Sequence, residues 1–66
     1  MIHLTVNGNE TAVPEGCTVG ALIERLAVQG RYAVEVDGSI VPRSQHAELV
    51  LRPGATVEVV RAIGGG

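Results

Sequence analysis

The stretch IHLTVNGNETAV, residues 2–13, decides the fold, because it predicts a β-hairpin at the start of the chain. Apolar and polar residues alternate over 2–6, which is the two-residue period of a strand with one buried face. Asn7-Gly8 then supplies the residue types that a type I′ turn favours, since both central positions need positive φ. Thr11–Val13 is expected to be the short return strand, and Pro14 to end it.

The composition indicates one small domain with an aliphatic core. The chain has 66 residues, 45% of them hydrophobic, with a net charge of −2, no Phe or Trp and one Tyr. Its five basic residues are all scattered arginines, so we expect no nucleic-acid partner. No apolar run approaches the ~20 residues of a membrane span, and no signal peptide is recognised, so we expect no membrane association and a cytoplasmic location. One Cys and two His make no zinc spacing, so no bound metal is expected.

A single amphipathic helix is expected after the hairpin. Thr18 has a side chain suited to accept from an unpaired backbone N–H at a helix start. Gly20 in the first turn permits another segment to approach closely, and Gly30 suits the left-handed position that ends a helix. The apolar residues at helical spacing are Val19, Leu22, Ile23 and Leu26.

The second half of the chain predicts short strands around one helical turn, which we expect Ser44 to cap. The expected extended segments are Ala33–Val36, Ile40–Val41, Leu49–Leu51 and Val57–Ala62. The β-branched content of the last of these suits the centre of a sheet. One helix covers one face of one sheet, so the sequence predicts a two-layer α+β domain. Its order of elements is that of a β-grasp, or ubiquitin-like, fold, with a mixed sheet of four to five strands.

The other face of this sheet is expected to be open to solvent. By the alternation of a strand, Val57 and Val59 turn toward the helix. The residues expected on the open face are Glu58, Val60 and Ala62, beside His3 and Thr5.

Two further motifs stand out, ValAspGlySerIleValProArg at 36–43 and ValValArgAlaIleGlyGlyGly at 59–66. With these motifs, the whole chain resembles the ThiS family, the small sulfur carrier proteins of thiamin thiazole synthesis. The resemblance divides the chain into a β-grasp domain at residues 1–62 and a flexible glycine tail at residues 63–66. His46 departs from the aromatic residue common in the family, and we expect it to soften the local packing without touching the chemistry.

The resemblance implies a carrier rather than an enzyme, with Gly66 as the covalent site. An adenylating, ThiF-like enzyme uses Mg-ATP to activate the Gly66 carboxylate, and a sulfur donor carrying a persulfide converts it to a thiocarboxylate. Thiazole synthase, ThiG-like, then receives the sulfur, while the carrier itself binds no cofactor. Gly64 and Gly65 would thread into the partner, since the three glycines reach roughly 10 Å when extended and carry no side chains. The absence of lysine removes side-chain amines that would attack the chain's own activated terminus.

Ordering such a tail costs about 1–2 kcal/mol per residue, so a contact surface on the folded body has to offset it. We expect that surface around Val60, Ala62 and Ile63, with Arg61 at its edge. Cys17 and the histidines have ordinary explanations, Cys17 as a loop thiol and His3 and His46 as surface side chains.

Other functions remain open for the same fold. One is a sulfur carrier for molybdopterin, thionucleosides or another sulfur metabolite, and another is a ubiquitin-like protein modifier. A third is an interaction module without chemistry, which predicts that removal of Gly65 and Gly66 leaves function intact. Thiocarboxylate formation, as opposed to isopeptide-linked products, separates a carrier from a modifier.

Overall fold

The structure is a computed structural model that describes residues 1–62. The predicted tail, residues 63–66, lies outside the described residues and stays a prediction. The elements, in chain order, are β1 (Ile2–Val6), β2 (Asn9–Val13), α1 (Val19–Leu26), β3 (Tyr32–Val36), β4 (Ser39–Val41), the 3₁₀ turn η1 (Arg43–Gln45) and β5 (Thr56–Arg61).

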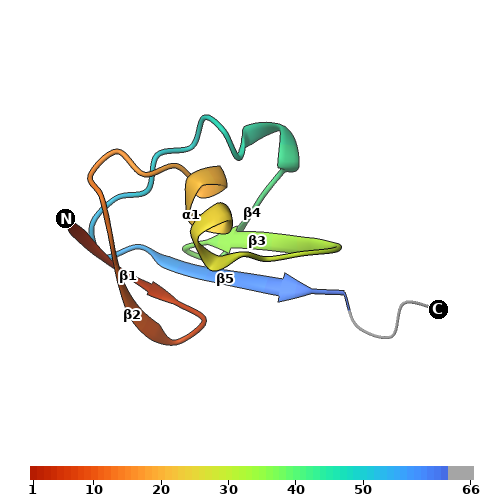
Figure 1. Cartoon of the computed structure of the whole chain (residues 1–66), viewed down its shortest axis with the longest axis horizontal. Helices are drawn as coiled ribbons and strands as arrows, with labels where there is room; N and C mark the ends of the chain where they lie inside the picture. Colours follow the sequence, from red (N-terminus) through yellow and green to blue (C-terminus); the bar gives the residue numbers. More distant parts are fainter. Residues whose placement is uncertain (63–66) are drawn as a thin grey trace.

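The described residues form one five-stranded sheet in the order β2-β1-β5-β3-β4. β1 and β5 run parallel, and the pairs β1–β2, β3–β4 and β3–β5 are antiparallel. Helix α1 packs over one face of this sheet, and β5 runs through its middle (Figure 1). The predicted α+β architecture, with a mixed sheet and one main helix, is confirmed, as is the central position of the last strand.

Both hairpins turn through pairs of residues with positive φ. Asn7 and Gly8 have φ of 49° and 83°, and Asp37 and Gly38 have φ of 51° and 86°. Asn and Asp tolerate this left-handed region better than other non-glycine residues do, and Gly pays no steric penalty there. The predicted turn at Asn7-Gly8 is therefore confirmed.

Helix α1 begins as predicted but ends earlier. The Ala21 N–H donates to Thr18 Oγ1 over 3.1 Å, which confirms the predicted cap. The helix ends at Leu26, because Ala27 adopts the left-handed conformation with φ of 55°. The prediction that Gly30 ends the helix is therefore wrong. The chain turns at Ala27 because Val28 then packs back against the core.

The core between α1 and the sheet is aliphatic, as the composition predicts. Alternate residues of β1 and β5 meet the buried face of the helix, and the Cys17 side chain joins them. The side chains with the least exposure are Leu4, Leu22, Val13, Val19, Val34 and Val57.

The segment between η1 and β5 runs beside the start of the helix instead of joining the sheet. The predicted strand Leu49–Leu51 is wrong, since its only ladder contact in the described residues is a bridge between Thr18 and Val50. The Leu51 N–H donates to the Cys17 carbonyl over 2.8 Å. The backbone groups of Leu49–Leu51 therefore pair with residues at the start of the helix and not with a strand of the sheet.

Gly20 is the point where this segment lies closest to the helix. The Gly20 N–H donates to the His46 carbonyl over 2.8 Å, and a Cβ at residue 20 would lie 3.3 Å from that same oxygen. This contact is tighter than a side chain normally permits, so the predicted close approach at Gly20 is confirmed.

Two predictions for the turn after β4 are wrong. The 3₁₀ turn follows Pro42, so Ser44 lies inside it and does not cap it. His46 is buried, with 9% of its surface exposed, and does not lie on the surface. Its Nε2–H donates to the Val41 carbonyl over 3.1 Å, and its ring stacks on Tyr32 at 6.1 Å between centroids. In a chain without Phe or Trp, this imidazole fills the position of an aromatic residue.

Candidate functional site: the end of strand β5

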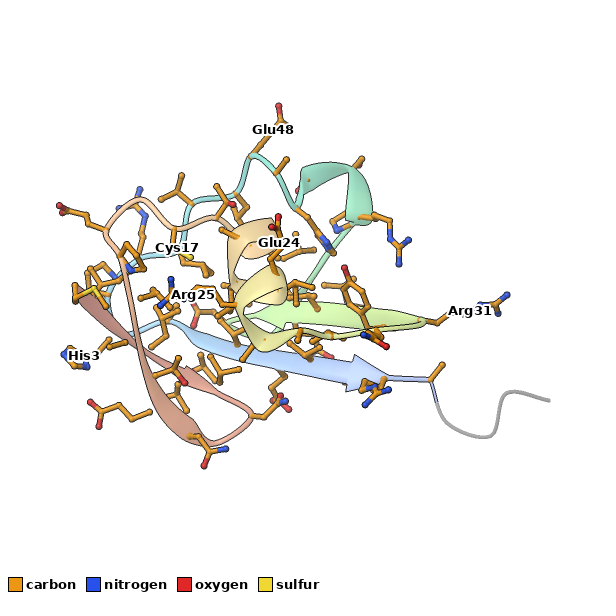
Figure 2. The ribbon with its side chains drawn as sticks, viewed as in Figure 1. His3, Cys17, Glu24, Arg25, Arg31 and Glu48 are labelled. Carbon is orange, nitrogen blue, oxygen red and sulfur yellow. The ribbon has the colours of Figure 1, made fainter. Side chains whose placement is uncertain are left out.

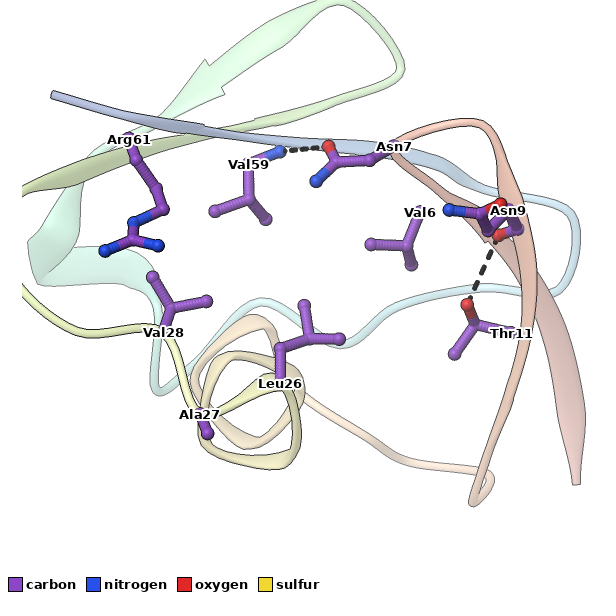
Figure 3. Close-up of a pocket in the computed structure, with 9 residues that line it drawn as sticks. All are labelled: Val6, Asn7, Asn9, Thr11, Leu26, Ala27, Val28, Val59 and Arg61. Atoms are coloured by element: carbon purple, nitrogen blue, oxygen red, sulfur yellow. Dashed lines mark hydrogen bonds between the residues drawn. The ribbon is translucent and has the colours of Figure 1, made fainter. Parts of the chain in front are cut away.

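Strand β5 is held by β1 only along its first part. The parallel pairing joins Thr5 to Thr56 and Val6 to Val57. The turn residue Asn7 extends it: its N–H donates to the Val57 carbonyl over 2.9 Å, and its Oδ1 accepts from the Val59 N–H over 2.8 Å (Figure 3). The Asn7 side chain thus takes the place of the backbone carbonyl that a further residue of β1 would offer to β5. The pairing between β1 and β5 ends at this point.

On its other side, β5 is paired with β3 from Val57 to its end at Arg61. The register runs from Val36 opposite Val57 to Tyr32 opposite Arg61. The Ala62 N–H then donates to the Arg31 carbonyl over 3.0 Å. The strand is therefore fixed in direction up to Ala62, and among the described residues its last part has β3 as its one neighbouring strand.

The predicted contact residues Val60 and Ala62 lie on the open face of the sheet. Val60 is 54% exposed, which is unusual for a β-branched residue in a central strand. Arg31 projects beside the end of β5 (Figure 2). A shallow hollow at this end is lined by Arg31, Tyr32, Ala33, Val60, Arg61 and Ala62.

Arg61, expected at the edge of the contact surface, lies on the helix side of the sheet, opposite to Val60. Its side chain points toward Val28 and Leu26 on the helix side (Figure 3). There it lines a groove of about 330 Å³ that also includes Val59 and Asn9. Val60 and Arg61 therefore belong to different surfaces, although they are neighbours in the chain.

The other predicted site residues lie outside the described residues. They are Ile63, Gly64, Gly65 and Gly66, and their roles in contact, threading and covalent chemistry stay predictions. The structure shows where the strand leading to them leaves the sheet, next to Arg31 and away from the N-terminus (Figure 1).

Residues of β3 and β4 add to this surface, and the sequence reasoning did not name them as site residues. Ile40 is 68% exposed and lies directly opposite Glu35, which in turn lies opposite Glu58. The alternation of β3, with Val34 buried, was a signal that Ala33 and Glu35 face the other way. Their proximity to Glu58 depends on the register, which the alternation alone does not give.

The described residues offer no candidate metal centre, since no three His, Cys, Asp or Glu side chains among residues 1–62 are placed to hold an ion. Cys17, expected as an ordinary loop thiol, is 7% exposed and belongs to the core. His3 lies on the surface as expected, with Nδ1 3.3 Å from Glu10 Oε2. Within the same described part of the chain, no helix is long and apolar enough to cross a membrane.

Comparison with known proteins gives consistent matches. The profile of the ThiS family matches residues 3–66. A protein named thiazole synthase, from Paramagnetospirillum magneticum, is 41% identical over 98% of this chain, but the chain spans only 20% of that protein's length. The crystal structure of the thiamine biosynthesis protein ThiS from Geobacter metallireducens is 30% identical, with a TM-score of 0.84 over 98% of this chain and 100% of that chain. A solution structure of a thiamine biosynthesis protein from the same organism gives a TM-score of 0.81, 30% identity, and coverage of 98% and 88%.

The sheet order, the single covering helix and these structural matches define a ubiquitin-like β-grasp protein. The chain belongs to the ThiS family, the family of small sulfur carriers that the two sequence motifs resemble.

Proposed function

We propose that this chain is the sulfur carrier protein of thiazole formation in thiamin biosynthesis. The observation that carries the proposal is the ThiS family match, which runs from residue 3 through Gly66 and so includes the glycine segment. The solved structures that resemble it bear the name of thiamine biosynthesis, and the similar curated protein bears the name thiazole synthase. Both names fit the formation of the thiazole part of thiamin.

The chemistry is proposed to take place at a free carboxylate on Gly66. A carboxylate oxygen attacks the α-phosphorus of Mg-ATP, pyrophosphate leaves, and an acyl-adenylate forms. A persulfide sulfur then attacks the acyl carbon and AMP leaves, giving an acyl disulfide. A thiol cleaves its S–S bond, which releases the thiocarboxylate and leaves the donor sulfur in a disulfide. The thiocarboxylate is a good nucleophile and delivers its sulfur to the thiazole precursor.

In this scheme the chain contributes a handle and its partners contribute catalysis. Strand β5 is paired with β3 up to Arg61, so the residues after it start from a fixed position and direction. Glycines suit a narrow channel because they have no side chains to exclude and they adopt any backbone conformation. Binding of the folded body offsets the entropy lost when the tail is ordered.

The partners of the proposed reaction are an adenylating enzyme of the ThiF type, a persulfide sulfur donor and a thiazole synthase of the ThiG type. Mg-ATP binds to the adenylating enzyme and not to the carrier. Because the activation consumes ATP, we place the reaction in the cytoplasm. The contact surface proposed for these partners comprises Val60, Ala62 and Ile63. Arg61, expected at its edge, lies instead on the helix side of the sheet.

The proposal is tested by following labelled sulfur through the pathway. The chain ending at Gly66 is incubated with the adenylating enzyme, Mg-ATP and a persulfide donor carrying radiolabelled sulfur, and thiazole synthase is added with its substrates. We expect label first on the carrier and then in the thiazole product. A matched chain that lacks Gly66 should accept no label. Label that stays on the carrier when thiazole synthase and its substrates are present would contradict a role in thiazole formation. Carrier found in isopeptide linkage to another protein, with no label in the thiazole product, would also contradict it.

A further inference from the structure

The sheet narrows to two strands at the end where the chain leaves it. Strand β4 pairs with β3 only at residues 34–36, and β1 pairs with β5 only at Thr56 and Val57. In the described part of the chain, residues 31–33 and 60–62 therefore pair with each other and with no further strand. We call these two short segments the exit ribbon, because the chain passes through them as it leaves the sheet (Figure 1).

The exit ribbon is held less firmly than the rest of the sheet. Two-stranded ribbons twist more than strands inside a wider sheet, and an isolated one is only marginally stable. The groove of about 330 Å³ lies on its helix side, where Arg61 faces Val28 and Asn9. This hollow leaves space into which the ribbon can tilt. The direction of the exit ribbon therefore depends on how its base is held.

The base of the ribbon is held by the side chain of Asn7. Backbone N–H groups point alternately to the two sides of a strand. The Ala62 N–H bonds to the β3 side, whereas the Val59 N–H points the other way and donates to Asn7 Oδ1 over 2.8 Å (Figure 3). On the opposite side of Val59, Val34 is held by Val41 of β4. Asn7 therefore completes the last row of the sheet before the ribbon begins.

The start of β5 carries a bond of the same chemistry. Asp37 precedes a glycine, as Asn7 does, and has a φ of 51°. Its Oδ1 accepts from the Thr56 N–H over 2.9 Å. Thr56 lies about 20 Å along the strand from Ala62, at roughly 3.3 Å per residue. The two side chains thus make the same bond to one strand, Asp37 far from the exit ribbon and Asn7 at its base.

We propose that Asn7 is a positioning residue for the activation of Gly66, because its bond to the Val59 N–H sets the direction in which the exit ribbon presents the tail to the adenylating enzyme. This inference rests on the proposed function and gives a role to a residue outside the proposed contact surface. Asn7 does not touch the reacting atoms and acts only through β5.

The length of the exit ribbon sets the size of the effect. From Val59 to Ala62 the strand runs about 10 Å, so a tilt of about 10° at Val59 moves Ala62 by about 2 Å. Displacements of this size at a reacting group cost a large part of the rate. The glycines that follow absorb part of the shift, since their backbone adopts many conformations. We therefore expect a moderate loss of rate when the bond is removed.

The test compares the two bonds to β5 by the same substitution. Asn7→Gly removes the acceptor, and a glycine tolerates the positive φ of the turn. Asp37→Gly is the matched control at the other end of the strand, and Asn7→Asp restores the acceptor at residue 7. Thermal unfolding first establishes a temperature at which all four chains are folded.

The quantity measured is the single-turnover rate constant for acyl-adenylate formation, with Mg-ATP and a saturating excess of the adenylating enzyme. High salt keeps the charge lost in Asp37→Gly from influencing the result. We expect Asn7→Gly to lower this rate constant about fivefold, since the loss of one neutral hydrogen bond shifts an equilibrium about two- to tenfold. Asp37→Gly and Asn7→Asp should both stay within about twofold of the unmodified chain, allowing for side-chain effects that remain small at exposed positions.

Amide hydrogen exchange identifies the cause of the loss. In Asn7→Gly the Val59 N–H should exchange faster, whereas the Val60 N–H, which faces β3, should keep its protection. Lost protection at Val60 would overturn the proposal, because the ribbon would then have come apart instead of changing direction. An unchanged exchange rate at Val59 would overturn it as well.

A saturated rate constant for Asn7→Gly within about twofold of the unmodified chain would overturn the proposal, since the direction of the ribbon would then not limit activation. An equal loss in Asp37→Gly, or no recovery in Asn7→Asp, would do the same. These outcomes are separate from the proposed function. An unmodified chain that forms no acyl-adenylate contradicts the carrier role, whereas equal rates in all four chains contradict only the role of Asn7.

Discussion

Val57 and Val60 are the same residue type on the same strand, yet the structure surrounds them differently. Val57 is fully buried beneath the helix and lies between two neighbouring strands, β1 and β3. Val60 is 54% exposed and pairs with Ala33 of β3, beyond the point where the β1 pairing ends. The first part of β5 is part of the core, and the last part is presented to solvent.

This difference separates the stability of the fold from the proposed contact with a partner. The start of the strand is anchored by apolar burial and by the side chain of Asn7. The end of β5 carries exposed residues such as Val60, whose apolar side chain contributes little to the core. Substitutions in the two regions should therefore affect different measurements, which the following predictions use from the largest expected effect to the smallest.

The largest effect is expected in the glycine segment. Gly65→Val adds a β-branched side chain where the proposed channel admits none. It should lower kcat/KM for adenylation by about 100-fold, since small displacements of a reacting group cost this much. Thermal unfolding should not change. Gln29→Val, which places the same β-branched side chain in an exposed loop of the folded body, is the control, and an equal loss there would show that the effect is not specific to the tail.

The next effect contrasts the two valines directly. Val57→Ala should destabilise the fold by about 2–3 kcal/mol, because it removes buried apolar surface and leaves a cavity. Val60→Ala should change stability by less than about 0.5 kcal/mol, as exposed substitutions usually do. Urea unfolding of both variants measures the free energies. Equal losses of unfolding free energy in the two variants would contradict the division of β5 into a buried first part and an exposed last part.

Asn7 tests the side chain that replaces the missing strand residue. Asn7→Ala removes the acceptor for the Val59 N–H and puts Ala at a φ of 49°, so we expect a loss of about 1–2 kcal/mol. Asn7→Asp keeps the acceptor and tolerates the same φ, so it should recover most of the stability. Chemical denaturation of the two variants is compared. If Asp recovers nothing, the hydrogen bond to Val59 is not the source of the loss.

The smallest effect is expected at the acidic pair of the open face. Glu35→Gln/Glu58→Gln should raise the free energy of unfolding by about 0.2–1 kcal/mol, the usual size of a cross-strand interaction. The gain should be larger at low salt than at high salt. A clear loss of stability in urea unfolding would show that the two carboxylates stabilise the sheet instead of repelling each other.

The local patterns were sufficient to predict most of the sheet and the central position of the last strand. Alternation in residues 2–6, the Asn7-Gly8 turn and the Thr18 cap each depend on neighbours in sequence, and all three are confirmed. The position of β5 followed from its β-branched composition. These features are set by short-range sterics and by the contrast between one buried and one exposed face.

The incorrect predictions concern residues whose conformation depends on distant parts of the chain. Leu49–Leu51 is apolar enough for a strand, but its backbone groups pair with the start of the helix. The helix ends at Leu26 and not near Gly30, since Ala27 turns the chain in the left-handed conformation and Val28 then packs against the core. His46 is buried because its ring stacks on Tyr32 from another strand.

The candidate site was predictable only in part, for the same reason. Alternation along β5 was enough to place Val60 on the open face. Glu35 and Glu58 lie opposite each other because of the register between β3 and β5. The sequence of neither strand alone predicts that register.

The most direct test of the carrier role is the intact mass of the chain ending at Gly66, taken before and after incubation with the adenylating enzyme, Mg-ATP and a persulfide donor. We predict a gain equal to the difference between one sulfur and one oxygen atom, located on the C-terminal peptide. The gain should be absent when ATP is omitted and in the chain that lacks Gly66. An unchanged mass, with an adenylating enzyme that modifies its own verified carrier under the same conditions, would contradict the proposed function.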